Sequence, residues 1–433
     1  MKTKKIINLV AADMGYGHQR AAYPLRDLSA GEIITINNYP GIPDWEKKYW
    51  IDSLRSYERF SRFREIPILG KAVFAIMDAF QKIKPRYPYR DLSRDTIQQK
   101  YFMQVIKKGL GKTLIKKLNK SALPFVTTFF VAAYIAEYHR YQGDIYCIIC
   151  DTDASRAWAP PEPAKSRIKF LVPSSQVRER FLMYGVRPDN IIITGFPLPK
   201  ENVGENKEII KKDLARRVLT LDPKGIYWEH YKDLLEGLNI ERPSQQKNSL
   251  VVPTITYAVG GAGAQKEIGL LILNQLALDI RNGRIKLNLV AGSRPEIRDY
   301  FQEEINKLDL KTNQGVNIIF DPDKIEYFKK FNKILHETDI LWTKPSELSF
   351  YCALGLPILM AEPLGSQENF NHDWLLAVGA GVDSLDPHYT AQWLADLLLS
   401  GRLARLATNG FLNAEQLGAY HITDLIKKKQ VKF

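Results

Sequence analysis

The sequence has little cysteine and no long apolar run, and both absences limit what the protein can be. Three cysteines among 433 residues are too few for a disulfide framework. The most apolar stretch, residues 122–136, contains a proline and two threonines and is shorter than the ~20 residues that a membrane-spanning helix needs. The opening MKTKKIINLVAADMGYGH lacks the small-residue cleavage site of a signal peptide. We therefore expect a cytoplasmic protein, either soluble or peripheral on the inner face of a membrane.

Acidic residues are outnumbered by basic ones, and this imbalance indicates anionic partners. Lys and Arg number 61 against 48 Asp and Glu, so the formal net charge is +13. Such an excess favours phosphates, nucleotides or an anionic membrane surface. The chain has no motif typical of RNA or DNA readers, so we expect no nucleic acid partner.

Two segments open in the same way, with an apolar strand, a glycine turn and a helix. The first has a strand at 5–12, a turn at 14–18 and a helix at 19–28, and the second has them at 254–259, 260–265 and 267–282. Continuous apolar strands that alternate with helices are typical of parallel sheets buried on both faces. The sequence therefore predicts an α/β protein with two Rossmann-like domains.

The composition along the chain suggests where these domains begin and end. Basic and aromatic residues alternate over about 44–120, which predicts an amphipathic, largely helical insertion in the first domain. Residues 204–249 are polar and helix-prone. We expect an N-terminal domain at 1–203, a helical linker at 204–249, a C-terminal domain at 250–390, and helices at 391–433 that cross back to the first domain.

The first candidate site is the turn Gly15-Tyr16-Gly17-His18. Glycines let a backbone approach a ligand closely, and the positive end of a helix dipole lowers the pKa of a histidine beside it. Neutral His18 could then accept a proton at pH 7. A plain tight turn with a solvent-facing histidine is the equally open alternative. The turn lacks the three glycines of the dinucleotide pattern GxGxxG.

The second candidate is another glycine-rich turn between a strand and a helix. It contains Gly260, Gly261, Ala262, Gly263 and Gln265. Ligands of parallel α/β sheets bind beyond the carboxyl ends of the strands. One glycine turn in each half therefore suggests a cleft with a phosphate-handling turn on both walls.

The third candidate is Asp151-Thr152-Asp153, which follows a predicted strand. It imitates the Asp-x-Asp metal–nucleotide motif, but a metal site needs more oxygen ligands than this segment offers. A polar wall or a strand-end cap is the favoured interpretation, and we expect no metal. The nearby CxxC pair, Cys147 and Cys150, is more simply two small core residues, because no second CxxC or histidine pair accompanies it.

The fourth candidate consists of polar clusters after two later strands. Carboxylates and amides there suit the hydroxyls of a sugar or ribose. We expect the second cluster to be a seven-residue turn, and solvated loop chemistry is the alternative for both. The donor-binding candidates in these clusters are Lys344, Ser346, Glu347, Gln367, Glu368 and Asn371.

These segments together resemble the two-domain GT-B glycosyltransferases of the family that holds monogalactosyldiacylglycerol synthase, the processive diacylglycerol glucosyltransferases and the peptidoglycan lipid N-acetylglucosaminyltransferase. The resemblance covers most of 1–30, 145–200 and 250–385. The segments that carry it are 15–18, 170–174, 184–186, 193–197, 260–265, 339–344, 355–357, 366–371 and 379–382.

The resemblance implies an inverting, metal-independent hexosyltransferase with two Rossmann-like domains facing a cleft. The donor diphosphate would lie on residues 261–265, and Gln367 and Glu368 would bind the sugar hydroxyls. His18, or alternatively Asp153, would deprotonate or orient the acceptor hydroxyl beside Gly15, Tyr16 and Gly17. No cofactor is implied beyond the nucleotide-sugar, which is a substrate.

Two departures and one unmatched segment leave alternatives open. The family's ribose-binding glutamate has no counterpart in 348–352, and Glu347 is the candidate to substitute for it from a different place. No histidine follows Asp153 before Trp158. The insertion at 44–120 is either a membrane-surface patch for a lipid acceptor or a solvated helical subdomain. Another nucleotide-sugar enzyme such as an epimerase, and a non-catalytic nucleotide-sugar or anionic-surface binding protein, remain as rival functions.

Overall fold

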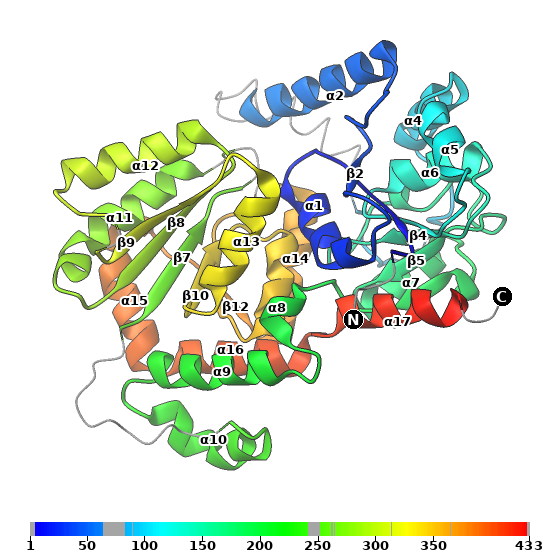
Figure 1. Ribbon diagram of the computed structural model, residues 1–433. Helices are drawn as coiled ribbons and strands as arrows, with labels where there is room; N and C mark the ends of the chain where they lie inside the picture. The colour runs from blue at the N-terminus through cyan, green and yellow to red at the C-terminus, as the bar shows by residue number, and fades with distance from the viewer. Residues whose placement is uncertain are drawn as a thin grey trace. The chain divides into compact units, whose positions relative to one another are not determined.

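The computed structural model shows a chain that folds as two α/β units (Figure 1). It describes residues 5–63, 83–88, 90–240, 252–260, 263, 265–312, 314–363 and 365–430. Unit 1 consists of Met1–Pro197, Gly365–Phe370 and Leu417–Phe433, and unit 2 of Leu198–Leu364 and Asn371–Gln416. Residues 204–249, which we expect to be a linker, group with unit 2, and of the C-terminal helices only the last groups with unit 1.

Unit 1 is built on a six-stranded, all-parallel sheet of order β2-β1-β3-β4-β5-β6. The apolar runs of the sequence form its central strands, which are buried on both faces, although each strand is shorter than its run. Its strands are β1 (Asn8–Ala11), β2 (Ile34–Thr35), β3 (Phe125–Thr127), β4 (Ile145–Ile148), β5 (Lys169–Val172) and β6 (Ile191–Ile193).

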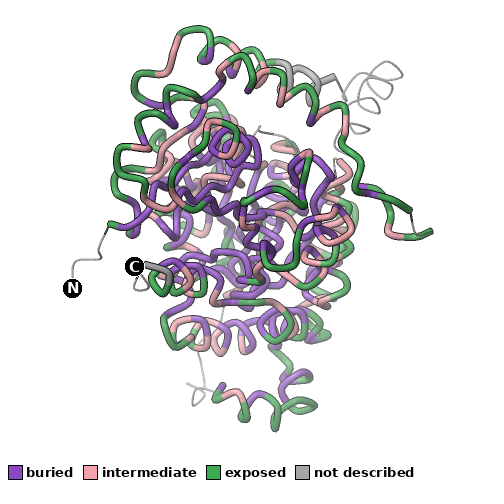
Figure 2. The backbone as a smooth tube through the Cα atoms, turned by 90° about the vertical axis from the view of Figure 1, so that its right-hand side faces the viewer, coloured by how far each residue is buried: buried purple, intermediate pink, exposed green. Residues whose placement is uncertain are grey.

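Helices cover both faces of this sheet. Val10 of β1 packs into a core with α6 and α7, whereas Leu9 and Ala11 face the opposite core, which contains Ile422 and Ile426 of α17. Buried residues accordingly concentrate in the interior (Figure 2). The helices are α1 (Tyr16–Ala22), η1 (Tyr23–Leu28), α6 (Phe130–Tyr138), η2 (Arg156–Trp158), α7 (Ser175–Met183), η3 (Pro188–Asn190) and α17 (Gly418–Gln430).

The predicted insertion contains three described helices, α2 (Asp44–Phe63), α4 (Ile97–Lys107) and α5 (Lys112–Leu118). Helix α2 is held by its buried Glu46, which accepts hydrogen bonds from Tyr39 Oη (3.0 Å) and the Gly111 amide (3.2 Å). Burial raises the pKa of the Glu46 carboxyl. Helix α4 begins with a capping box in which Thr96 and Gln99 exchange side-chain-to-backbone bonds.

Unit 2 has a second six-stranded parallel sheet, of order β12-β11-β10-β7-β8-β9. A row of hydrogen-bonded polar side chains crosses it, half-buried at Asn317 and buried at the other two: Asn317 Nδ2 donates to Asn288 Oδ1 (3.0 Å), and Asn288 Nδ2 donates to Thr256 Oγ1 (3.1 Å). The strands are β7 (Thr254–Ala258), β8 (Lys286–Gly292), β9 (Val316–Phe320), β10 (Ile340–Thr343), β11 (Ile358–Met360) and β12 (Gly381–Asp383). The two parallel sheets confirm the predicted α/β class with two Rossmann-like domains.

Helices α9 and α16 pack against each other and against η4. The buried Arg217 of α9 donates to the carbonyls of Leu335, Thr338 and Leu354, and burial lowers its pKa to about 10. The helices are α8 (Lys200–Val203), α9 (Glu208–Leu221), α10 (Ile226–Gly237), α11 (Lys266–Arg281), α12 (Pro295–Lys307), α13 (Lys324–Leu335), η4 (Glu347–Leu354), η5 (Pro387–Tyr389), α15 (Thr390–Leu399) and α16 (Arg402–Asn413).

One local prediction is wrong. Residues 365–371, expected to be a turn, lead into helix α14 (Ser366–Val378). The helix buries Asn371 and Leu375, which lie one turn apart on the same face. Its first residues group with unit 1 and the rest, from Asn371 on, with unit 2.

Candidate functional site

The unit 1 candidates gather where β1, β3 and β4 end. Gly15 precedes α1 with a φ of 104°, a conformation that favours glycine. His18 lies in α1, and its carbonyl accepts a hydrogen bond from Thr128 Oγ1 (2.8 Å), which follows β3. Tyr16 is buried, whereas Gly17 and His18 are half-buried. Helix α1 thus begins inside the turn expected at 14–18, and its first turn holds His18 at the carboxyl edge of the sheet.

Aromatic rings surround the His18 imidazole. Its centroid lies 5.1 Å from that of Phe129 and 6.1 Å from that of Trp158. Phe129 in turn contacts Trp50 of α2, with 6.3 Å between the ring centroids. Such contacts fix the orientation of a ring and restrict water around it. Trp158 lies within 145–200, which the resemblance covers, whereas Trp50 and Phe129 lie outside the covered segments.

Asp153 lies in a closed environment. The Asp153 and Arg180 side chains are almost completely buried, and Arg180 Nη2 lies 2.7 Å from Asp153 Oδ2. Arg180 Nε donates to both carboxylate oxygens, at 2.9 and 3.2 Å. A carboxylate engaged in this way favours a structural role over proton abstraction. Sequence reasoning missed Arg180, because nothing near Asp153 in the chain indicates a partner on α7.

The cysteines of β4 and its following loop are part of the core. Cys147 and Cys150 are buried, and burial raises the pKa of the Cys147 thiol far above its usual range. Among the residues that the structure describes, no group of three His, Cys, Asp or Glu side chains is arranged to hold a metal ion.

In unit 2, the glycine turn after β7 lies against a lysine from the end of β10. A Cβ built on Gly260 would lie 2.9 Å from Lys344 Cε. Gln265, which precedes α11, donates from Nε2 to the Glu362 carbonyl just beyond β11 (2.9 Å), and its own carbonyl accepts from Tyr257 Oη (2.5 Å). Because β7, β10 and β11 are neighbours in the sheet, their carboxyl ends bring these residues together. Gly263 has a φ of 79°, whereas the predicted Gly261 and Ala262 lie outside the described residues.

The polar segment after β10 caps a short helix. Ser346 Oγ accepts from the Leu348 amide (3.5 Å) at the start of η4, and Glu347 is half-buried in the first turn. On α14, Gln367 and Glu368 are half-buried and Asn371 is fully buried. Gln367 and Glu368 group with unit 1, and Asn371 groups with unit 2 together with Lys344, Ser346 and Glu347.

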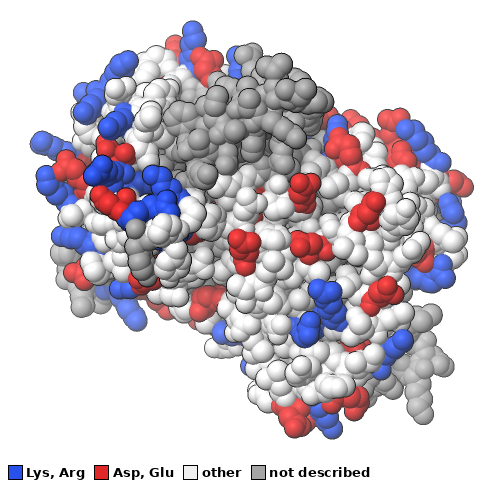
Figure 3. Space-filling view, turned by 180° about the vertical axis from the view of Figure 1, so that it is seen from behind, with Lys and Arg blue, Asp and Glu red and all other residues white. Residues whose placement is uncertain are grey.

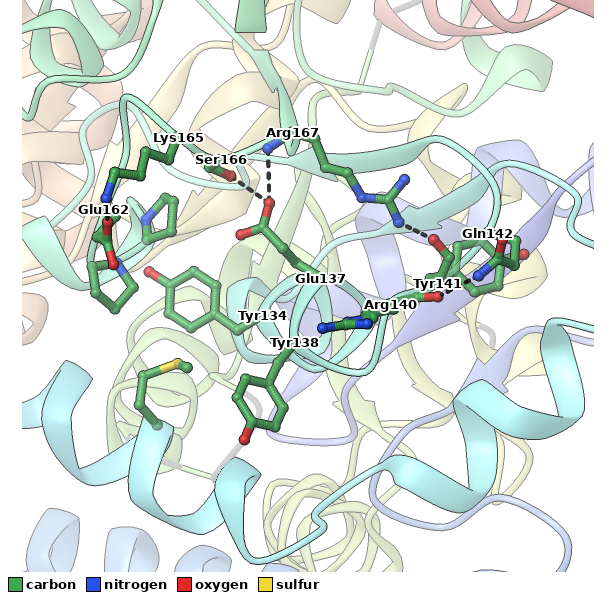
Figure 4. A pocket seen from close by; sticks show the side chains of 13 residues that line it. Tyr134, Glu137, Tyr138, Arg140, Tyr141, Gln142, Glu162, Lys165, Ser166 and Arg167 are labelled. Atoms are coloured by element: carbon green, nitrogen blue, oxygen red, sulfur yellow. Dashed lines mark hydrogen bonds and ion pairs between the residues drawn. The ribbon is translucent and has the colours of Figure 1, made fainter.

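A cavity of about 590 Å³ lies elsewhere in unit 1 (Figure 4). Its walls are the C-terminal part of α6 and the loops at 140–142 and 160–167, so it contains none of the described candidate residues. Glu137 accepts from Ser166 Oγ (2.9 Å) and from the Arg167 amide (2.8 Å), which holds one loop against the helix. Helix α6 ends and β4 and β5 begin there, so the cavity lies at the amino ends of the strands, away from His18.

Comparison with known proteins gives one curated relative and several solved structures. The relative is the processive diacylglycerol beta-glucosyltransferase of Bacillus subtilis (strain 168), 19% identical over 391 residues, which covers 88% of this chain and 84% of the relative. No family model matches the chain.

The solved structures include MurG of Acinetobacter baumannii, at 13% identity and a TM-score of 0.47 over 98% of this chain and 99% of that one. The UDP-GlcNAc 2-epimerase of Methanocaldococcus jannaschii has 12% identity and a TM-score of 0.44 over the same shares. The curated relative is one of the enzymes named in the predicted resemblance. That resemblance is confirmed: the chain is similar, along most of its length, to a processive diacylglycerol glucosyltransferase.

Proposed function

We propose that the protein is a glycosyltransferase that moves a hexosyl group from a UDP-sugar to a hydroxyl acceptor. The observation that carries the proposal is the similarity to a diacylglycerol glucosyltransferase over 88% of the chain. The two parallel sheets and their glycine turns are consistent with it. The acceptor oxygen would form a bond to the anomeric carbon with inversion, while the bond from that carbon to the diphosphate breaks and UDP leaves.

The donor diphosphate would bind at the turn after β7. Gly260 leaves room for the Lys344 side chain, which brings an ammonium from the neighbouring strand end to this turn. Backbone N–H groups at the start of α11 add a positive potential. Together these groups would stabilise the charge that develops on the leaving UDP without a metal ion. Gln367 and Glu368 would bind the sugar hydroxyls.

His18 would accept the proton of the acceptor hydroxyl. The ring is half-buried and packs against Phe129 and Trp158, so it is held in one orientation. Proton transfer to a positioned imidazole is a common form of general base catalysis. Asp153 is the weaker candidate because Arg180 already binds its carboxylate.

The surface of the insertion favours a lipid acceptor at an anionic membrane. Residues 97–120 contain seven lysines and no acidic residue, and all seven lysines are exposed. Figure 3 shows the molecule from behind, so α4 and α5, on the right in Figure 1, lie on its left. Lys and Arg side chains gather on that side. Ile97 and Tyr101 on α4 are also exposed (73% and 50%). Lysines attract anionic headgroups, and the exposed apolar side chains can enter the interface. Among the described helices, none is both long enough and apolar enough to cross a membrane.

A thermal-shift panel of nucleotide-sugars tests the donor assignment. A UDP-sugar at about 100 times its Kd should stabilise the wild type by ~2.7 kcal/mol. Lys344→Met removes the cation and keeps much of the side-chain volume. It should therefore lower the affinity for UDP-sugar and the affinity for UDP alike, by roughly 10-fold. Lys286→Met, at the amino end of β8, is the matched control and should bind normally. No stabilisation by any UDP-sugar would contradict the proposed function.

Product analysis separates the transferase from an epimerase. A transferase releases UDP only when an acceptor is present, whereas an epimerase returns a UDP-sugar of changed stereochemistry without any acceptor. Vesicles that contain diacylglycerol, with soluble alcohols as a comparison, would identify the acceptor class.

A further inference from the structure

We propose that Arg180 is a positioning residue for the first turn of α14, acting through the strap at residues 83–86. The inference rests on the proposed function, in which Gln367 and Glu368 of that turn bind the donor sugar. Arg180 itself would touch no substrate. Its role is to hold the backbone segment against which the sugar-binding turn begins.

Arg180 is the fixed point of this arrangement. Its Nε and Nη2 bind the Asp153 carboxylate, and its Nη1 donates to the Lys84 carbonyl in the strap (2.8 Å). One guanidinium thus joins α7, the loop after β4 and the strap. The fork of an arginine can serve an acid and a carbonyl at once, which a lysine ammonium cannot do with the same geometry.

The strap and the guanidinium both reach the start of α14. The amide of Ile83, the buried residue of the strap, donates to Ser366 Oγ, the first residue of the helix (3.4 Å). The Phe370 ring lies 5.8 Å from the Arg180 guanidinium carbon. Gln367 and Glu368 lie between these two contacts in the sequence. Arg86 Nη2 donates to the Gln176 carbonyl (2.5 Å) and fixes the far end of the strap.

These contacts predict that loss of the Arg180 side chain weakens binding of the sugar part of the donor more than binding of the nucleotide part. If the strap shifts, the turn at 366–370 loses its support, while Gly260 and Lys344 in unit 2 keep theirs. Affinity for UDP-sugar should then fall and affinity for UDP should not. A merely structural role for Arg180 would lower stability and change both affinities together.

The test measures the Kd of UDP and of the UDP-sugar by calorimetry for three variants. Arg180→Lys keeps a charge beside Asp153 but cannot also hold the Lys84 carbonyl, and Ser366→Ala removes the acceptor of the Ile83 amide. Both should weaken UDP-sugar binding by roughly 5- to 10-fold and change UDP binding less than 2-fold. Arg216→Lys is the matched control, because Arg216 also donates to a buried aspartate, Asp339, and to a carbonyl, that of Thr338, without contact to the strap.

Equal changes for UDP and UDP-sugar, or none in Ser366→Ala and Arg180→Lys, would overturn the positioning role while leaving the proposed function intact. If Arg180→Lys does not fold, Ser366→Ala and Phe370→Leu decide the question, since neither leaves a buried charge. Failure of the wild type to bind any UDP-sugar would instead remove the proposed function, and this inference with it.

Discussion

At the scale of single residues, the two candidate bases of unit 1 differ in what surrounds them. His18 is half-buried, with the rings of Phe129 and Trp158 beside its imidazole. Asp153 is about 1% exposed and bound by two nitrogens of Arg180. Reaching Asp153 would require an opening of that ion pair, which costs several kcal/mol when one partner is left buried and unpaired.

Replacement of His18 should therefore slow the reaction without removing donor binding. His18→Ala is expected to lower turnover by roughly 10²–10⁴-fold, because the acceptor hydroxyl loses its base. His18→Gln, which can hydrogen-bond but cannot accept the proton, should be nearly as slow. Donor affinity measured by calorimetry should stay close to the wild type in both.

His388→Ala, at an exposed histidine of unit 2, is the control and should keep full activity. Recovery of most of the rate in His18→Gln would mean that His18 only orients the acceptor. Full activity in both His18 variants would contradict its assignment as the base.

At the scale of elements, α14 is tied to β12 by a charged bridge. His372 Nε2 lies 2.7 Å from Asp383 Oδ1, and its Nδ1 lies 3.2 Å from Asp373 Oδ1. Partial burial works against protonation of His372, but the two carboxylates outweigh it and raise its pKa above the ordinary value. The bridge joins α14 to β12 one turn after the sugar-binding candidates.

The bridge should make part of the stability depend on pH. Because the folded pKa is raised, its contribution is complete below the unfolded pKa near ~6.5 and is lost as pH rises through the higher folded value. Asp383→Asn should lower the melting temperature by about 1–3 °C at pH 6 and by less at pH 9. Asp396→Asn on α15, an exposed aspartate, should show no such trend in the same scans. A pH-independent difference for Asp383→Asn would mean that His372 is neutral in the bridge.

The sequence predicts the buried strands well because their signals are local. Continuous apolar runs mark β1 and β7, which are expected at 5–12 and 254–259 and observed at Asn8–Ala11 and Thr254–Ala258. Helix α12 has a weaker signal in the sequence, which consists of Pro295 at its start and the apolar series Ile297, Phe301 and Ile305. The start of α14 could not be predicted, because its first polar residues have no apolar period and its support comes from the distant strap.

In the candidate site, too, local features are predictable from the sequence and contacts between distant segments are not. The glycine turns were visible in the sequence, since turn chemistry is local. The approach of Lys344 to Gly260 was not, because it depends on β10 pairing with β7 across 85 positions. The Asp153–Arg180 pair likewise depends on the packing of α7.

At the scale of the whole molecule, positive charge is distributed unevenly. The net charge of +13 includes seven lysines in 97–120 that no acidic residue of that segment balances. Such a surface should attract anionic lipids over a distance of about a Debye length and lose that attraction as salt rises. This is the surface that we propose meets an anionic membrane.

Liposome binding tests this surface. The protein should bind vesicles of anionic lipid at low salt and dissociate as salt increases. Replacement of Lys107, Lys108, Lys116 and Lys117 by glutamine should weaken binding by roughly 10- to 1,000-fold, at up to ~1 kcal/mol per lysine. A parallel variant that neutralises Arg55, Arg59, Arg62 and Arg64 tests the α2 side of the insertion, where the last three side chains lie outside the described residues.

A control variant separates the effect of the charge on the insertion from the effect of the net charge of the protein. In it, glutamine replaces four exposed lysines of unit 2, which are Lys212, Lys224, Lys286 and Lys311. Equal loss in this control would mean that total charge, rather than the insertion, drives binding. No binding of the wild type at low salt would favour a soluble acceptor.

The position of helix α17 in the sequence has a consequence for the order in which the two units can finish folding. It belongs to unit 1, where Ala419, Ile422 and Ile426 cover the face of the sheet that carries Leu9 and Ala11. During translation the strands of this sheet leave the ribosome first, but the helix that covers them emerges only after all of unit 2. Unit 1 therefore cannot bury this apolar face before the whole of unit 2 has been synthesised, and nascent unit 1 keeps that face open to chaperones until then.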